Sequence, residues 1–167
     1  MNIEKAIDIL KKNVPKPEEG LPDPLFYYVS TVTPYVNVDL LIKDENGRTL
    51  LSWRNDKYTG QGWHVPGGIV RFRETFEERI NKVAQTEVGA LVKFDQKPIA
   101  INQIIIRDHP IRSHFISILF KCSLPSSFIP KNNGISINDP GYLMWHDNCP
   151  DDLLIYHNIY KKFINKT

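Results

Sequence analysis

The chain has 167 residues, which suits one domain with a sizeable hydrophobic core. Apolar residues make up 41% of it and charged residues 24%, a composition typical of globular proteins. The net charge is only +2 and no basic run stands out, so nucleic acid is not expected as a partner. A small anionic ligand held by a few placed cations is the better expectation.

The sequence also argues against a membrane span and against a zinc site or a disulfide framework. No apolar stretch is long enough to span a bilayer and no N-terminal signal pattern is present, so we expect a cytoplasmic protein without a membrane partner. Cys122 and Cys149 have neither the spacing of zinc ligands nor that of a disulfide framework.

The N-terminal part is predicted to be an arm outside the main domain. Apolar residues at helical spacing between Ile3 and Leu10 predict a short amphipathic helix. A linker rich in Pro and Glu follows, from Val14 to Pro24. We therefore assign residues 1–24 to an arm and linker, and residues 25–167 to one domain.

The middle of the chain predicts a sheet. Tyr35–Lys43 alternates apolar residues, Asn46-Gly47 is a strong hairpin turn, and Thr49–Arg54 returns as the partner strand. Further strands are predicted at Leu91–Phe94, Ile99–Arg107, His114–Ser123 and Tyr142–His146.

A C-terminal helix completes the expected architecture. It begins after Pro150-Asp151-Asp152, where acidic residues suit a helix N-terminus. A second long helix is predicted between Thr75 and Gly89. With these two helices, the strands imply an α/β fold with a mixed central sheet covered on both faces, an α/β/α sandwich.

The segment Val65–Ala90 combines a glycine loop with a helix. Pro66-Gly67-Gly68 allows a sharp turn that offers backbone amides and a carbonyl to a ligand. Thr75 is expected to start the helix, with Glu78 completing a capping box. Gly89 ends it. Apolar residues at three- and four-residue spacing form its packing stripe, namely Phe76, Ile80, Val83 and Ala84.

This segment resembles the Nudix box, in which Gly and Glu are followed by Arg-Glu, a Glu-Glu pair and a Gly at fixed spacing. The residues that match are Gly68, Glu74, Ala84, Glu87, Gly89 and Ala90. The arginine of the box is Lys82 here, and two of its three clustered glutamates are Val83 and Thr86. One carboxylate of the cluster is left.

Positions 83, 86 and 87 share one helix face because they are three and four residues apart. In the box this face points several carboxylates at a cluster of divalent cations, whereas here it offers Glu87 alone. Since Mg2+ is usually held by one or two carboxylates plus substrate phosphates, the sequence favours a single ion bound with a nucleotide.

The same losses occur in the GDP-mannose mannosyl hydrolase branch of the Nudix superfamily, and the chain resembles that branch beyond the box. The similar segments are Asp23–Asp39, Arg54, Gln61–Gly68 and Ser113-His114-Phe115. The resemblance covers about residues 23 to 163.

The resemblance implies a hydrolase that substitutes at the anomeric carbon of a nucleotide sugar and releases a nucleoside diphosphate. By position, the carbonyl of Gly67 and the carboxylate of Glu87 would hold Mg2+, with Mn2+ as an alternative. Arg54 would lie against the departing diphosphate. The expected substrate contacts are Arg54, Trp63, His64 and Gly68. The residues with an expected structural role in the box are Gly68, Glu74, Lys82 and Gly89, with Glu74 pairing to Lys82 or Arg79.

The chain departs from the branch at two places that bear on activity. The branch has an arginine just after the glycine pair, where this chain has Ile69. The late loop that carries a metal-binding amide and a histidine base in the branch is Asn138–Tyr142 here. Asp139 is the candidate for the base or an extra metal ligand, because a carboxylate can do either. His114 and His146 are its rivals.

Three functions are therefore compatible with the sequence. The leading one is a Mg2+-dependent hydrolase of GDP-mannose or a related GDP-hexose. A variant is an ordinary Nudix pyrophosphohydrolase of a nucleoside diphosphate derivative. The third is a non-catalytic nucleotide-sugar-binding protein whose altered box marks lost activity. The resemblance also implies a homodimer.

Overall fold

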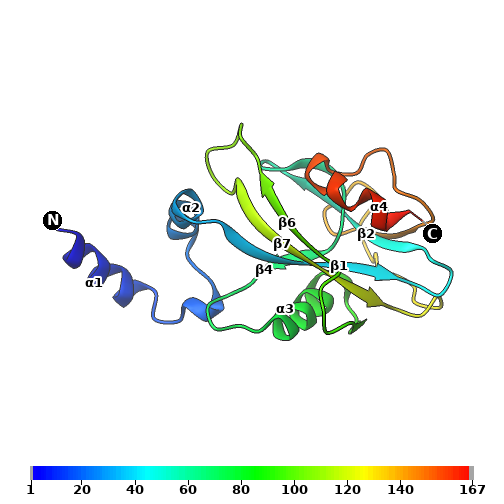
Figure 1. Cartoon of the computed structure of the whole chain (residues 1–167), viewed down its shortest axis with the longest axis horizontal. Helices are drawn as coiled ribbons and strands as arrows, with labels where there is room; N and C mark the ends of the chain where they lie inside the picture. The colour runs from blue at the N-terminus through cyan, green and yellow to red at the C-terminus, as the bar shows by residue number, and fades with distance from the viewer. Residues whose placement is uncertain (1, 166–167) are drawn as a thin grey trace.

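A computed structural model describes residues 2–165 of the chain (Figure 1). Its centre is one mixed sheet with the order β3-β2-β1-β7-β5, in which β4 pairs with β1, β6 with β7 and β8 with β2. The strands are β1 (Tyr35–Lys43), β2 (Thr49–Asp56), β3 (Gly60–His64), β4 (Gly67–Ile69), β5 (Lys93–Phe94), β6 (Ala100–Ile105), β7 (His114–Ser123) and β8 (Leu143–His146).

The chain also forms helical segments, some against the faces of this sheet and one extending away from it. They are α1 (Ile3–Asn13), η1 (Pro17–Glu19), α2 (Asp23–Val32), α3 (Phe76–Val83), η2 (Ala84–Val88), η3 (Ile155–Tyr160) and α4 (Lys161–Ile164). Figure 1 shows α3 against one face and α4 against the other. The predicted α/β/α sandwich with a mixed sheet is thus confirmed. No helix within residues 2–165 is long and apolar enough to cross a membrane.

The central strand β1 divides the core between the two faces. It runs parallel to β7 from Tyr35 opposite Phe115 to Lys43 opposite Ser123. Because side chains alternate along a strand, its residues Val38, Leu40 and Ile42 join a core with α3. Leu41 joins a second core, with Tyr160 and Ile164 of the C-terminal segment. Asp39 lies on the same side of β1 as Leu41.

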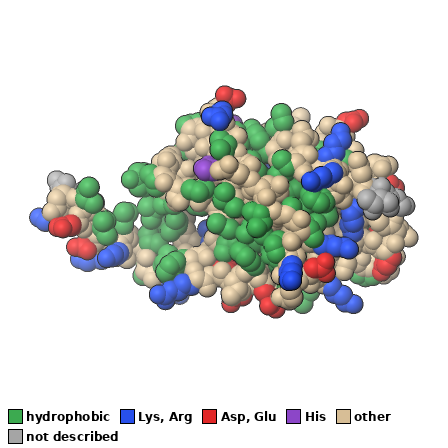
Figure 2. Space-filling model, viewed as in Figure 1, with side chains coloured by type: hydrophobic (Ala, Val, Ile, Leu, Met, Phe, Trp, Pro, Cys, Tyr) green, Lys and Arg blue, Asp and Glu red, His purple; other side chains and the backbone are tan. Residues whose placement is uncertain are grey.

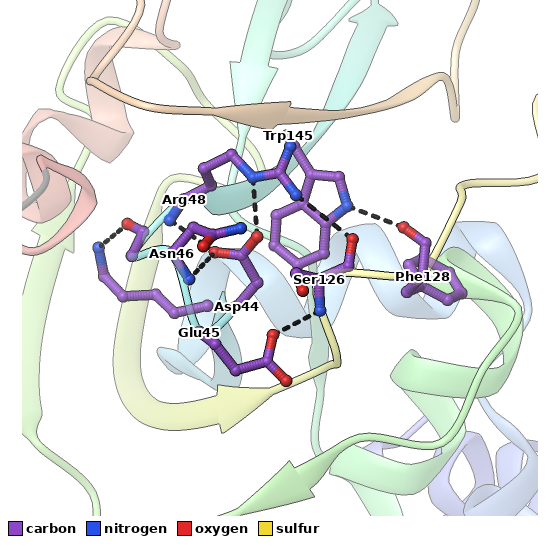
Figure 3. A network of polar contacts seen from close by, with 9 residues as sticks. Asp44, Glu45, Asn46, Arg48, Ser126, Phe128 and Trp145 are labelled. Atoms are coloured by element: carbon purple, nitrogen blue, oxygen red, sulfur yellow. Dashed lines mark hydrogen bonds and ion pairs between the residues drawn. The ribbon is translucent and has the colours of Figure 1, made fainter.

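The hairpin predicted at Asn46-Gly47 is present and is tied to the long loop before β8 (Figure 3). Asp44 accepts hydrogen bonds from the backbone N–H groups of Asn46 and Arg48 at 3.0 and 2.8 Å, and Gly47 has φ of 78°. The Arg48 guanidinium lies 5.4 Å from the ring centre of Trp145, whose Nε1 donates to the Phe128 carbonyl at 3.1 Å. These contacts anchor the loop to the sheet.

The N-terminal arm differs from the prediction in one element. Helix α1 forms as expected, has no buried residue, and extends away from the domain in Figures 1 and 2. Helix α2 was not predicted and spans the expected boundary at residue 24. Its run of aromatic and β-branched residues favours a strand by propensity, but Asp23-Pro24 supplies a suitable first turn. Phe26 of α2 stacks on Tyr35 at 4.9 Å between ring centres.

Several other boundaries are shorter than predicted. β5 and β6 lose residues at their ends, and the C-terminal helix consists of a 3-10 segment followed by one α-helical turn. The local sequence determines the ends of an element least, because the cross-strand partners decide where the hydrogen-bonded pairing of a strand stops.

Candidate functional site

The loop and helix of Val65–Ala90 form as the spacing predicts, with one addition. The Thr75 hydroxyl accepts from the Glu78 backbone N–H at 3.2 Å, and the Glu78 carboxylate accepts from the Thr75 N–H at 2.8 Å, so the capping box is complete. After Val83 the helix widens into a π-helical turn, η2, which ends at Gly89 with φ of 74°. Such turns are frequent at functional sites.

The three helix positions that carry carboxylates in the Nudix box have separate roles here. Val83 is 3% exposed and belongs to the core beneath the sheet. The Thr86 hydroxyl donates to the Lys82 carbonyl at 2.8 Å. Glu87 is the only one of the three that presents a carboxylate to a cavity.

Glu74 holds the loop as expected for a structural residue. Its carboxylate accepts from Nε and pairs with Nη2 of Arg79, both at 2.8 Å, and accepts from the Arg71 backbone N–H at 2.8 Å. Of the two expected partners, Arg79 is therefore the one used. Lys82 is exposed to solvent.

The glycine pair permits a close approach of backbone and side chains. Gly67 pairs with Asp39 across β4 and β1. A methyl group on Gly67 would overlap the Asp39 carboxylate and lie 2.8 Å from the Val38 carbonyl. A methyl group on Gly68 would lie 2.8 Å from the Val83 side chain. Neither glycine has a positive φ, so lack of space is the reason for glycine at both positions.

Two adjoining cavities of about 370 and 470 Å³ meet at Arg54 and His64, which line both. The first cavity also includes Asn37, Asp39, Gly67, Gly68, Ser117 and His157. The second also includes Ser52, Asp56, Glu87, Gly89, Pro140 and Gly141. The box loop and helix thus open onto a hollow that strands β1, β2 and β7 also line.

Arg54 dominates the electrostatics of this hollow. It is 29% exposed and its nearest carboxylate is that of Asp56, with Nε and Oδ2 3.8 Å apart. Its positive charge opposes the rise in the pKa of Asp39 and of Glu87, and it favours the neutral rings of His64 and His157. The guanidinium is therefore close to every titratable group of the site and only loosely paired.

Glu87 lies beside the glycine loop. Its side chain is 32% exposed, and its Oε2 is 3.9 Å from Nε2 of His64. Burial raises the pKa of Glu87 to about 7, against the opposing effects of Arg54 and of a hydrogen bond from the Gly67 backbone. The carboxylate lacks a full set of compensating charges.

Asp39 is a site residue that the sequence reasoning missed. It is 3% exposed, and it accepts hydrogen bonds from Tyr160 at 2.5 Å, from Asn37 at 2.6 Å and from the Ser117 hydroxyl. Burial raises its pKa to about 6, while these hydrogen bonds and Arg54 act in the opposite direction. A carboxylate inside an otherwise apolar strand was the sequence pattern that could have identified it.

Two histidines complete the site. His64 is 4% exposed, and neither of its ring nitrogens has a hydrogen-bond partner within residues 2–165. Its burial lowers its pKa well below the usual value. His157 was not among the predicted residues. Its Nδ1 accepts from the Val65 backbone N–H at 3.2 Å, and burial lowers its pKa to about 3. Its ring is therefore neutral with the proton on Nε2.

The three residues proposed for the base do not line either cavity. Asp139 is exposed and accepts a hydrogen bond from the Ser136 backbone N–H at 2.6 Å within its own turn. His114 lies on the opposite side of β7 from Ser117, because side chains alternate along a strand. His146 packs against Trp63, with 4.5 Å between ring centres.

Trp63 is likewise placed in the core instead of at the expected substrate contact. It is 3% exposed and packs edge-on against Trp53 at 5.2 Å between ring centres. Its position on β3 faces the second hydrophobic core, whereas the next residue, His64, faces the cavities.

The arrangement can accommodate a single cation. Within residues 2–165 no group of three or more His, Cys, Asp or Glu side chains is placed to hold a metal. Of the three expected metal ligands, Gly67 and Glu87 lie together and Asp139 lies elsewhere. Because the charge of Glu87 is incompletely compensated, one divalent ion whose shell is completed by ligand phosphates fits the residues present.

Comparison with known proteins finds sequence relatives over part of the chain. No protein-family model matches the chain. The low-salt glycan biosynthesis protein Agl8 of Haloferax volcanii is 34% identical over 82 residues. The match covers 49% of this chain and 52% of the relative, so it spans about half the length of each.

Solved structures resemble the chain over a larger part of its length. A MutT Nudix hydrolase from Burkholderia pseudomallei has a TM-score of 0.61 and 20% identity, covering 80% of this chain and 99% of that one. The MutT protein of Methanosarcina mazei Go1 has a TM-score of 0.59 and 20% identity, covering 79% and 91%. A UDP-X diphosphatase has a TM-score of 0.55 and 18% identity, covering 98% and 68%. The chain has the fold of the Nudix hydrolases.

Proposed function

We propose that the protein is a Mg2+-dependent hydrolase of a nucleotide sugar, with GDP-mannose or a related GDP-hexose as substrate. It releases a nucleoside diphosphate and the free sugar by attack of water at the anomeric carbon. The observation that carries this proposal is that Glu87 alone, of the three helix positions, presents a carboxylate to the cavities. A single carboxylate suits stabilisation of a diphosphate leaving group better than assembly of a multi-ion centre.

Arg54 and Glu87 are assigned to the leaving group. Bound at the Gly67 carbonyl and the Glu87 carboxylate, Mg2+ would supply positive charge to the departing diphosphate. Arg54 supplies a guanidinium for the same phosphates, because its contact with Asp56 at 3.8 Å leaves its donors largely free. Both groups act where negative charge develops in the transition state.

Asp39 is assigned as the general base in place of Asp139, His114 and His146. Its pKa of about 6 keeps most of the carboxylate ionised at neutral pH and still able to accept a proton. Its Oδ1 faces Gly67 and accepts one hydrogen bond, from Asn37, so an acceptor position is left for water. The bonds from Tyr160 and Ser117 to the other oxygen hold the carboxylate in place.

His157 is assigned to ligand binding as a neutral donor. Because its Nδ1 accepts from Val65, its Nε2 carries the proton and can donate to a sugar hydroxyl or a phosphate oxygen. His64, with both ring nitrogens unpaired beside Glu87, is assigned to the same ligand.

The second candidate is a pyrophosphohydrolase, in which water attacks phosphorus. The shared fold of two MutT proteins and a UDP-X diphosphatase favours it over unrelated activities. The third candidate, a nucleotide-sugar-binding protein without turnover, is favoured by the position of Asp139, which lies in a turn outside the cavities.

Product analysis in ¹⁸O-labelled water separates the three. The protein is incubated with Mg2+ and a panel of nucleotide sugars, and the products are examined by mass spectrometry. We expect label in the free sugar and unlabelled nucleoside diphosphate. Label in a phosphate would support the pyrophosphohydrolase, and saturable binding without turnover would support the binding protein.

A further inference from the structure

One side of the first cavity is built from residues that the proposed reaction does not use. Phe26 of α2, Arg71 before α3 and Arg112 in the loop between β6 and β7 line it. The Arg112 backbone N–H donates to the Ser30 hydroxyl of α2 at 3.0 Å, and that hydroxyl donates to the Tyr27 carbonyl at 2.6 Å. The unpredicted helix α2 therefore holds the loop in place beside the cavity.

The Arg112 side chain is positioned without a negatively charged partner. Its guanidinium carbon lies 5.7 Å from the ring centre of Phe26 and 5.1 Å from that of Tyr58. Its Nε is buried and has no hydrogen-bond partner within residues 2–165, and no ion pair to Arg112 forms in that range. A buried donor without an acceptor is costly, and a ligand oxygen would satisfy it.

The backbone of Arg112 is also held in an uncommon conformation. Its φ of 52° lies in the left-handed region, which non-glycine residues seldom adopt. The bond to Ser30 stabilises this conformation and keeps the side chain at the cavity.

The charge of the cavity favours an anion. Four arginines line it, namely Arg54, Arg71, Arg79 and Arg112, and Asp39 is the only carboxylate among its described lining residues. Arg79 is neutralised by Glu74, whereas Arg71 and Arg112 form no ion pair within residues 2–165. A cavity lined by unpaired cations concentrates anions from solution.

The positive charges form two groups. Arg54 acts on Asp39, Glu87 and His157. Arg71 and Arg112 act together on Tyr35, whose pKa is raised by burial against the opposing effect of both guanidiniums. The pair formed by Arg71 and Arg112 is therefore a separate positive region beside Tyr35.

We propose that Arg112, together with Arg71, binds an anionic group of the ligand on the Tyr35 side of the cavity. The group is a planar carboxylate or a tetrahedral phosphate. Guanidinium groups recognise the oxygens of both through paired hydrogen bonds. Its source is either the diphosphate or a carboxylate on the sugar, as in a hexuronic acid. This proposal rests on the proposed function only in taking a nucleotide sugar as the ligand.

The test measures binding without added Mg2+, because the proposed turnover depends on that ion. Isothermal titration calorimetry is carried out with inorganic pyrophosphate and with the matched pair GDP-mannose and GDP-mannuronate, on the full chain. The variants are Arg112→Gln, which removes the charge, and Arg112→Lys, which keeps it. Arg107→Gln is the control, because Arg107 is an exposed arginine of the same loop that does not line the cavity. Circular dichroism checks that each variant folds.

We expect Arg112→Gln to raise the Kd of at least one probe about tenfold to a hundredfold, with a smaller effect of Arg112→Lys and none of Arg107→Gln. Weakened binding of pyrophosphate and both sugars identifies the diphosphate as the anion. Weakened binding of GDP-mannuronate alone identifies the carboxylate.

The proposal is overturned when a folded Arg112→Gln protein binds all three probes as the wild type does, or when the wild type binds none of them. Its failure is distinguishable from failure of the proposed function. A wild-type protein that turns over no nucleotide sugar but binds an anion through Arg112 would support the anion site and contradict the proposed function. Turnover of a nucleotide sugar together with binding that does not depend on Arg112 would support the proposed function and contradict the anion site.

Discussion

Two carboxylates with raised pKa values lie on either side of the Gly67 backbone, and only one of them belongs to the Nudix box. Asp39 comes from the centre of the sheet, and Glu87 comes from the end of the box helix. Arg54 opposes the rise in both pKa values but removes neither. At the residue scale the site therefore combines a buried carboxylate with a partly exposed one, the groups proposed as the base and the cation ligand.

Glu87→Gln tests the metal assignment. Gln keeps the shape of the side chain but removes the charge that would hold Mg2+, so we expect turnover to fall at least about 100-fold, measured as product release at saturating Mg2+. Glu77→Gln, an exposed glutamate of α3, is the matched control and should retain wild-type turnover. Undiminished turnover in Glu87→Gln would contradict the assignment.

Asp39→Asn tests the base through the pH dependence of activity. The base must be ionised, so wild-type kcat/KM should fall as the pH drops through about 6, the pKa of Asp39. The Asn variant should lose about 100-fold or more of the rate at neutral pH. A variant with the wild-type rate and the same acidic limb would exclude Asp39 as the base.

The raised pKa of Asp39 also predicts the sign of a stability effect. The folded state binds the Asp39 proton more tightly than the unfolded state, so this group stabilises at low pH and its contribution is lost as the pH rises through about 6. Relative to Asp39→Asn, the wild type should therefore lose stability mainly between about pH 4 and about pH 6 in urea unfolding. Asp8→Asn, on the exposed face of α1, is the matched control substitution.

At the scale of elements, the glycines at the two ends of the box serve different purposes. Gly67 is required because β4 lies directly against Asp39 and the Val38 carbonyl. Gly89 is required because its φ of 74° closes the helix, while no atom lies within 4 Å of an added methyl group. Crowding at one end and backbone strain at the other thus select the same residue type.

Alanine substitutions separate these two causes. Gly89→Ala should cost about 1 kcal/mol in the free energy of unfolding and reduce turnover less than Gly67→Ala does, because only strain is added. Gly67→Ala should cost more and abolish most turnover, because strand β4 or Asp39 must move. Urea unfolding and a turnover assay on both variants test this. The prediction would be contradicted if the two variants lost the same stability and the same turnover.

At the scale of the whole molecule, the N-terminal arm stands apart from the domain. Helix α1 exposes Ile3, Ile7 and Leu10 at 78%, 44% and 42%, while α2 is joined to the domain through Phe26 and Ser30. The boundary that matters for the site therefore lies before α2 and not within it, because α2 supplies one wall of the first cavity.

Truncation tests the homodimer that the sequence resemblance implies. Residues 3–13 carry exposed apolar side chains and include no buried residue, so the domain should stay folded and active when residues 1–13 are removed. We expect the full chain to be a dimer and the truncated chain a monomer by light scattering, since an exposed apolar helix face favours burial against a second copy. A monomeric full chain would contradict the homodimer.

The sequence by itself determined the features that depend on neighbours a few residues apart. The capping box of Thr75 and Glu78, the pairing of Glu74 with either Lys82 or Arg79, and the loss of carboxylates at Val83 and Thr86 were all readable from spacing. Each is set within one or two helical turns, where backbone geometry places residues three to five positions apart in contact.

The composition of the cavity was decided only by the tertiary structure. Asp39, His157 and Arg112 come from the first strand, the C-terminal segment and the loop between β6 and β7, and no local spacing connects them. Asp139, His114 and His146 carry the right chemistry but lie in a turn, on the opposite side of a strand and against Trp63. Strand pairing and its register decide which residues face one another across long separations, and neither is visible in a short stretch of sequence.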